Sequence, residues 1–178
     1  MQLLEEVILV DTLDNEMGAM EKMEAHQKGL LHRAFSVFLF DKQGNMLLQK
    51  RAMCKYHSPG LWTNTCCSHP RPGENVHEAA KRRLMEEMGI DCKTEYAFNF
   101  IYHASLDQGL TEHELDHVFV GIYDGIISPN ANEVSHYLYE SMEEIKHKVK
   151  NAPEQFTVWF NIAFPKVLEW YELKFVNS

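Results

Sequence analysis

The sequence predicts an α/β or α+β fold in which a mixed β-sheet is sandwiched between helices. Residues 33–40 form an aromatic and β-branched run typical of a central strand, and residues 76–88 form a helix pattern with start and stop signals. Further strand-like and helix-like segments alternate along the rest of the chain. The length suits one domain spanning residues 1–178, and no stretch in the middle has the composition of a linker.

The N-terminal part of the chain is expected to contribute three strands. Residues 6–10 are a short apolar run typical of a strand, and an acidic, glycine-containing turn is expected at residues 11–18. The long strand at residues 33–40 is followed by a turn at residues 41–45, and residues 46–50 are expected to return as its hairpin partner.

The helix at residues 76–88 has both of its ends marked in the sequence. Asn75 can cap its first turn, with Glu78 three residues later, and Gly89 stands where a left-handed C-terminal cap is expected. The remaining elements are expected as strands near residues 95–103 and 114–123 and as helices near residues 142–150 and 155–169, the last interrupted at Pro165.

Composition and charge disfavour several classes of protein. The net charge of −9 argues against binding to nucleic acid or an anionic membrane, because both select for excess lysine and arginine. Residues 1–6 lack the pattern of a secretory signal, and no stretch approaches the roughly 20 apolar residues that cross a bilayer. The four cysteines form no C-x-x-C pair. We therefore expect a cytoplasmic protein with reduced thiols, in which a basic cluster or a metal ion meets any anionic ligand.

Carboxylates and arginines recur at i,i+4 spacing on the helix at residues 76–88. Arg82 and Arg83 lie four residues before Glu86 and Glu87, and Glu74 precedes the helix in a loop. Carboxylates in this arrangement can bind a Mg²⁺ ion that bridges to a diphosphate. The alternative is a solvated charged face held by ion pairs, which is the commoner role of such runs.

Three other segments supply candidate metal ligands, namely three imidazoles and two carboxylates. This donor set suits Mn²⁺, Zn²⁺, Fe²⁺ or Mg²⁺ in five- or six-fold coordination. Each histidine taken singly is more often a surface or hydrogen-bonded residue than a ligand. Spacing alone does not show that residues from three segments converge. The candidates are His26, His32, His69, Glu112 and Glu114.

Four motifs together are similar to those of one enzyme family. They are A-H-x4-L-H-R-A-F-S-V-F-L-F at residues 25–40, W-T-N-T-C-C-S-H-P at residues 62–70, E-x-E at residues 112–114 and an altered Nudix box at residues 68–89. Ser68 replaces the first glycine of that box, and Arg83 replaces a metal-binding glutamate. Over about residues 5–160 the chain resembles the type I isopentenyl-diphosphate isomerases, and this resemblance implies a Nudix fold.

The resemblance implies a role for each motif residue. The three histidines and two glutamates would hold one Mn²⁺, Zn²⁺ or Mg²⁺ ion, and Glu87 would help to hold a Mg²⁺ ion on the substrate diphosphate. Cys67 would act as one acid/base, and Glu114, with Tyr102 beside it, as the other. Trp159 would face a cationic intermediate. The residues expected around the diphosphate are Lys22, Arg51, Lys55, Ser68 and Arg83.

The implied reaction interconverts isopentenyl diphosphate and dimethylallyl diphosphate through a tertiary carbocation. Protonating an unactivated alkene requires a strong, positioned acid, and a metal-bound carboxyl group meets that need. An aromatic face stabilises a desolvated cation by about 2 kcal/mol. Val158 precedes Trp159 where the family usually has proline, so a plain core role for Trp159 stays open.

Two other functions stay open from the sequence. A Nudix hydrolase of a nucleoside diphosphate derivative is one, and Arg83 inside the box argues against it. A non-catalytic module that binds metal or diphosphate is the other, and it would have no use for Cys67, Tyr102 and Trp159. The sequence does not reveal the oligomeric state.

Overall fold

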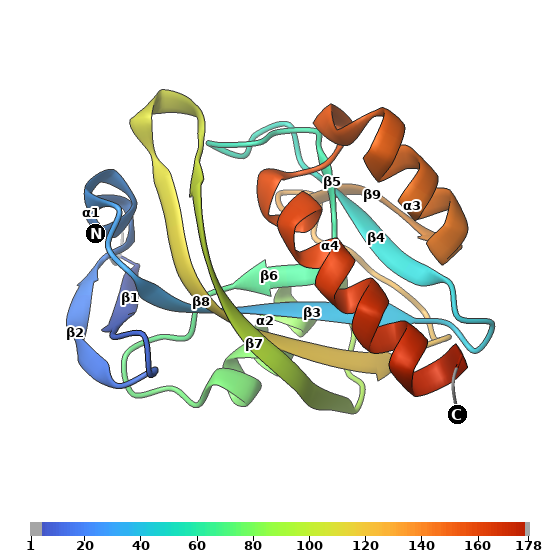
Figure 1. The fold of residues 1–178 in the computed structure, drawn as a ribbon, viewed down its shortest axis with the longest axis horizontal. Coiled ribbons are helices and arrows are strands. Elements are labelled where there is room, and N and C mark those ends of the chain that lie inside the picture. The colour runs from blue at the N-terminus through green and yellow to red at the C-terminus, as the bar shows by residue number, and fades with distance from the viewer. Residues whose placement is uncertain (1–4, 177–178) are drawn as a thin grey trace.

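A mixed β-sheet lies between helices in the computed structural model, which describes residues 5–176 (Figure 1). The helices α3 (Met142–Asn151) and α4 (Val158–Tyr171) cover one face, and α2 (Val76–Met88) covers the other. The expected α+β class, with helices on both sides of the sheet, is therefore confirmed. Residues 1–4, on which the expectation of no secretory signal partly rests, lie outside the described residues.

The core is divided in two by β3 (His32–Phe40), because successive side chains of a strand point to opposite faces. Phe38 and Phe40 pack with α3 and α4, whereas Phe35 and Val37 pack with α2. All four side chains are at most 4% exposed. Burial on both faces explains why the sequence of β3 is a continuous apolar run rather than an alternating one.

The strand β8 (Thr111–Ile122) places one glutamate beside two other site residues. It runs parallel to β3 and antiparallel to β7 (Thr94–Ser105). In this register Glu114 lies opposite His32 on β3 and opposite Tyr102 on β7. Strand pairing therefore brings together residues that are up to about 80 positions apart in the sequence.

The hairpin expected after β3 is formed at its turn but splays along its length. Its second strand, β4 (Met46–Arg51), registers with β3 at the pair Phe40–Met46 and then pairs with β9 (Val134–Glu140). The expectation that residues 46–50 return as the hairpin partner of β3 is confirmed at the turn only, because a later segment enters between the two strands further along. That segment contains β5 (Trp62–Thr63), which pairs with β4, and β6 (Cys66–Ser68), which pairs with β3.

Buried polar groups hold this inserted segment in place. The hydroxyl of Thr65 donates to the carbonyl of Leu47 on β4 (2.8 Å) and accepts from the N–H of Leu39 on β3 (3.0 Å). One side chain thus bridges the two splayed strands, and it is fully buried. The pairing of β6 then sets Cys67 opposite Ser36, on the sheet face that α4 covers.

Several elements escaped the sequence prediction. The expected turn at residues 11–18 is wrong in its second half, where β2 (Glu16–Glu21) pairs with β1 (Glu6–Val10). β2 is largely exposed, so its sequence carries no apolar alternation. The helix α1 (Lys22–Lys28) spans only seven residues, and its N-cap is Glu21 rather than one of the preferred capping residues.

The prediction that Pro165 interrupts the last helix was wrong. α4 continues through Pro165 to Tyr171, although proline lacks the N–H that would bond to the carbonyl of Asn161. Burial of Phe160 and Phe164 against the sheet outweighs that loss. Residues 5–176 also contain three short helical turns: η1 (Asp107–Gly109), η2 (Pro153–Gln155) and η3 (Glu172–Val176). Within residues 5–176 no helix has the length and apolar character to cross a membrane.

Candidate active site

One pocket on the α4 side of the sheet is lined by nearly all the residues that the sequence nominated. His32 lies beside it in a five-residue cluster with His26, His69 and the two glutamates. The structure adds Ser36, Tyr56 and His57, which the sequence did not nominate. The nominated residues on the pocket lining are Lys22, His26, Arg51, Lys55, Cys67, Ser68, His69, Arg83, Glu87, Tyr102, Glu112, Glu114 and Trp159.

Three histidines and two glutamates from four parts of the chain form a group able to hold a metal ion. One ligand atom from each residue lies within 4.8 Å of all the others. The five side chains are at most 9% exposed. Among the described residues, four buried atoms of this group have no hydrogen-bond partner: His26 Nε2, His32 Nε2, His69 Nδ1 and Glu112 Oε2. Orphaned buried polar atoms are costly, so a cation that binds them would fit the group.

Backbone carbonyls orient two of these imidazoles. The Nδ1–H of His26 donates to the carbonyl of Lys22 (2.6 Å), and that of His32 donates to the carbonyl of Leu30 (2.8 Å). Because a carbonyl oxygen only accepts, each Nδ1 carries the proton in the neutral ring. Each Nε2 is then left with a lone pair that points toward the centre of the group, as a metal ligand requires.

The two carboxyl groups of this cluster have opposite pKa shifts. Burial and the charge of Glu114 raise the pKa of Glu112. Burial also acts to raise the pKa of Glu114, but the nearby Glu112, His32 and Tyr102 side chains outweigh it and lower that pKa to about 2. The phenol of Tyr102 donates to the second oxygen of Glu114 (2.8 Å).

Cys67 projects from β6 into the same pocket. Burial, reinforced by the charge of Glu87, raises the pKa of its thiol well above the usual range. The sulfur is thus protonated near neutral pH. It is not disulfide-bonded, and neither is its neighbour Cys66.

Trp159 lies in the first turn of α4 and faces the pocket rather than serving only as core. Its ring is 5.2 Å from the guanidinium of Arg51 and meets the ring of His57 edge-on at 5.5 Å. Val158 at the preceding position does not disturb this placement, because Thr157 caps the helix through the N–H of Phe160. Burial and the charge of Arg51 lower the pKa of His57 to about 3, so its ring is neutral.

The charged residues of α2 fall into two sets, one at the surface and one in the pocket. Arg82 makes a bidentate ion pair with Glu74 (2.7 and 2.9 Å) and a longer contact with Glu86 (3.3 Å) at the surface. The solvated-face alternative is therefore right for these residues. Glu87, in contrast, is 5% exposed and accepts from the amide of Gln49 inside the pocket (3.0 Å).

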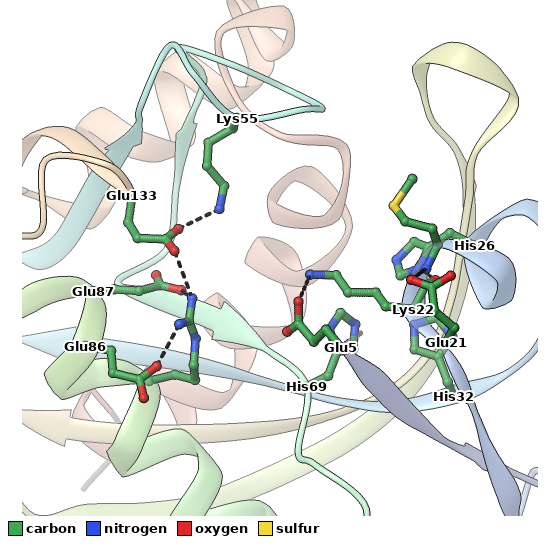
Figure 2. Close-up of polar contacts among 12 residues, drawn as sticks. Glu5, Glu21, Lys22, His26, His32, Lys55, His69, Glu86, Glu87 and Glu133 are labelled. Atoms are coloured by element: carbon green, nitrogen blue, oxygen red, sulfur yellow. Dashed lines mark hydrogen bonds and ion pairs between the residues drawn. The ribbon is translucent and has the colours of Figure 1, made fainter. Parts of the chain in front are cut away.

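Cations on the other side of the pocket from the histidines are paired with carboxylates (Figure 2). Arg83 contacts Glu87 at 2.6 Å, and Lys55 contacts Glu133 at 2.5 Å. Lys22, nearer the histidines, pairs with Glu5 at 3.0 Å. Two buried guanidinium Nε–H groups, of Arg51 and Arg83, have no hydrogen-bond partner among the described residues. They are donors available to an anion.

Comparisons with known proteins agree with this arrangement. The NUDIX domain model matches residues 30–160. An isopentenyl-diphosphate Delta-isomerase of Pectobacterium atrosepticum is 50% identical over 169 residues, which cover 95% of this chain and 94% of the relative. An isopentenyl-diphosphate Delta-isomerase 2 of Photorhabdus laumondii is 49% identical over 172 residues, which cover 94% of this chain and 97% of the relative.

Solved structures share the fold at low identity. A Deinococcus radiodurans protein superposes with a TM-score of 0.70 at 18% identity, covering 83% of this chain and 90% of that chain. A MutT NUDIX hydrolase of Burkholderia pseudomallei gives a TM-score of 0.60 at 17% identity, covering 77% and 98%. These two show the fold alone. The family model and the curated relatives establish that the chain belongs to the NUDIX family and, within it, to the isopentenyl-diphosphate Delta-isomerases.

Proposed function

We propose that the chain interconverts isopentenyl diphosphate and dimethylallyl diphosphate and so serves isoprenoid biosynthesis. The observation that carries this proposal is the convergence of Cys67, the Glu114–Tyr102 pair and Trp159 on one pocket. A phosphate hydrolase has no evident use for a protonated thiol and a buried indole at this place. A bond-shifting enzyme needs two proton-transfer groups and a surface that tolerates a cation.

Glu114 and Cys67 are the acid/base pair in this proposal. One adds a proton to the terminal alkene carbon, and the other removes a proton from the neighbouring methylene, so the double bond moves with no net change in atoms. Tyr102 holds Glu114 by its hydrogen bond and keeps the carboxyl group in one orientation. A divalent ion bound by the His/Glu cluster, such as Mn²⁺, Zn²⁺ or Mg²⁺, would increase the acidity of Glu114.

Trp159 would stabilise the tertiary carbocation between the two proton transfers. An indole face offers about 2 kcal/mol to a desolvated cation and cannot trap it as a nucleophile would. Its 5% exposure, and the neutral ring of His57 against it, keep water from the same region. Water exclusion matters because hydration would convert the cation to an alcohol.

The diphosphate would be held by the cationic part of the pocket. Glu87 would bind a Mg²⁺ ion that chelates the diphosphate, and the unpartnered Nε–H groups of Arg51 and Arg83 would donate to its oxygens. The other residues proposed to contact it are Lys22, Lys55 and Ser68. With a net charge of −9, we further propose a cytoplasmic enzyme that binds neither nucleic acid nor membranes.

The test is a product assay with two substrate classes. Purified protein is incubated with Mg²⁺ and Mn²⁺ and either isopentenyl diphosphate or a panel of nucleoside diphosphate derivatives. Dimethylallyl diphosphate from the first, without phosphate release from the second, supports the proposal. Phosphate or nucleoside monophosphate from the panel, with no isomer, would mean that the chain is a hydrolase.

A further inference from the structure

Glu133 has no role in the proposed chemistry, yet its carboxylate lies among the cations proposed to bind the diphosphate. Glu133 sits in the turn before β9, and its side chain is 22% exposed. One of its oxygens contacts Lys55 Nζ at 2.5 Å, and the other contacts Arg83 Nη2 at 3.4 Å. Figure 2 shows Glu133 between Lys55 and the end of the α2 helix that carries Glu86 and Glu87.

The backbone around Glu133 ties together the two segments that carry these cations. Its carbonyl accepts from the N–H of Ala52, at the start of the loop that bears Lys55 (2.9 Å), and its N–H donates to the carbonyl of Asn130 (2.9 Å). The N–H of Asn130 in turn donates to the carbonyl of Glu87, on the helix that bears Arg83 (2.9 Å). Glu133 is therefore fixed with respect to both partners.

Lys55 needs such an anchor more than Arg83 does. Arg83 extends from a helix and is also held by Glu86 and Glu87. Lys55 lies on a loop with two left-handed residues, Ser58 and Gly60, and a lysine side chain has four rotatable bonds to restrain. Lys55 makes its ion pair with Glu133, whose pKa is lowered because the Lys55 hydrogen bond and charge outweigh burial.

We propose that Glu133 is a positioning residue that holds Lys55 against Arg83, so that the two cations form one preassembled diphosphate clamp. The inference rests on the proposed function, in which both cations meet the diphosphate. It predicts a change in anion affinity opposite in sign to the change expected from charge alone. Removing a negative charge near an anion site should strengthen anion binding, whereas loss of a positioning residue should weaken it.

The experiment compares the full-length wild type with Glu133→Gln, Lys55→Met and the double variant. We measure KM and kcat for isopentenyl diphosphate, and calorimetric binding of inorganic pyrophosphate with Mg²⁺. Glu133→Gln is expected to raise KM and the pyrophosphate Kd about tenfold while kcat changes less than about twofold. In the Lys55→Met background the same change should add less than about twofold, because Glu133 acts through Lys55.

Glu140→Gln is the matched control, because Glu140 lies on β9 and pairs with Lys148 away from the pocket. It should leave KM and pyrophosphate binding unchanged. If Glu133→Gln does not fold, Glu133→Asp keeps the charge and should retain part of the affinity, while Lys55→Met should reproduce the tenfold loss.

Four results would overturn the inference. Unchanged pyrophosphate binding by Glu133→Gln would show that Glu133 does not affect the site. Tighter binding would show that Glu133 competes with the anion for the cations. Equal effects in the wild-type and Lys55→Met backgrounds would deny the coupling. Weaker binding of Mg²⁺ alone would make Glu133 a metal ligand. If pyrophosphate binding shows the coupling but wild type forms no isomer, the clamp stands and the proposed function fails.

Discussion

The His/Glu cluster and the Lys55–Glu133–Arg83 group share one pocket but are satisfied in different ways. In the first, four buried side-chain atoms lack any hydrogen-bond partner among residues 5–176. In the second, every terminal cationic group named here already contacts a carboxylate, as Figure 2 shows for Lys55 and Glu133. The first group would gain partners for these atoms by binding a cation. The second must exchange protein partners for a substrate.

This difference predicts different costs of binding. An ion bound by the His/Glu cluster would remove the penalty of its orphaned polar atoms. A diphosphate that enters the other group competes with Glu87 and Glu133 for Arg83 and Lys55, so its net gain is smaller and more sensitive to salt. The groups proposed to transfer protons, Cys67 and the Glu114–Tyr102 pair, belong to the buried part of the pocket.

The largest expected effect is loss of chemistry where the reacting groups lie. Cys67→Ala and Glu114→Gln should each lower kcat by about 10²–10⁴-fold, because each removes one positioned proton-transfer group. Steady-state rates with isopentenyl diphosphate, alongside circular dichroism to verify folding, make the measurement. Turnover near that of the wild type in either folded variant would contradict the assigned role.

Metal binding should stabilise the fold through the His/Glu cluster and not through the Lys55–Glu133–Arg83 group. At a Mn²⁺ concentration of about 100 Kd, the wild type should gain about 2.7 kcal/mol of unfolding free energy, and His69→Asn should lose most of that gain. Lys55→Met should keep it. Denaturant unfolding with Mn²⁺ or with EDTA measures this gain in unfolding free energy. If His69→Asn and Lys55→Met lose the same part of it, the two groups do not differ in metal binding.

Substrate affinity should depend on salt, and metal affinity much less. Raising ionic strength from about 0.05 to 0.3 M should raise KM for isopentenyl diphosphate several-fold. The reason is that salt screens the charges of Lys55 and Arg83, which are partly exposed. The Kd for Mn²⁺ should change by less, since the cluster side chains are at most 9% exposed. An equal salt response of both constants would speak against the comparison.

The smallest expected effect concerns His57, whose folded pKa of about 3 lies below its unfolded value of 6.5. As the pH falls below 6.5 the unfolded chain binds this proton first, so stability is lost between about pH 6.5 and pH 3. From pH 7.5 to 5.5 His57 should account for about 1 kcal/mol of that loss. His57→Phe should flatten the pH dependence by this amount in urea unfolding, and an unchanged slope would show that His57 titrates normally.

Sequence reasoning succeeded where a local signal exists. The bounds of α2 followed from Asn75 and Gly89, and β3 followed from a run that is apolar because both of its faces are buried. It failed for β2, which forms through pairing with β1, and for Pro165, which packing keeps inside α4. These outcomes depend on contacts that no short segment encodes.

The residues of the candidate site also differ in whether the sequence marks them. The family resemblance pointed to the metal ligands, to Cys67 and to Trp159, yet spacing could not show that they meet. That convergence depends on the register of β3, β7 and β8 and on the segment that enters between β3 and β4. Glu133 and His57 had no motif to mark them, because their roles come from neighbours distant in the sequence.

The most direct test of the central claim is isomerisation in heavy water followed by NMR. Purified protein with Mg²⁺ and Mn²⁺ should convert isopentenyl diphosphate to dimethylallyl diphosphate that carries deuterium, and EDTA should abolish the conversion. Deuterium in the product would show that the double bond moves by proton exchange with groups in equilibrium with solvent. No isomer under these conditions, or isomer formed at the full rate in EDTA, would contradict a metal-assisted proton-transfer isomerase.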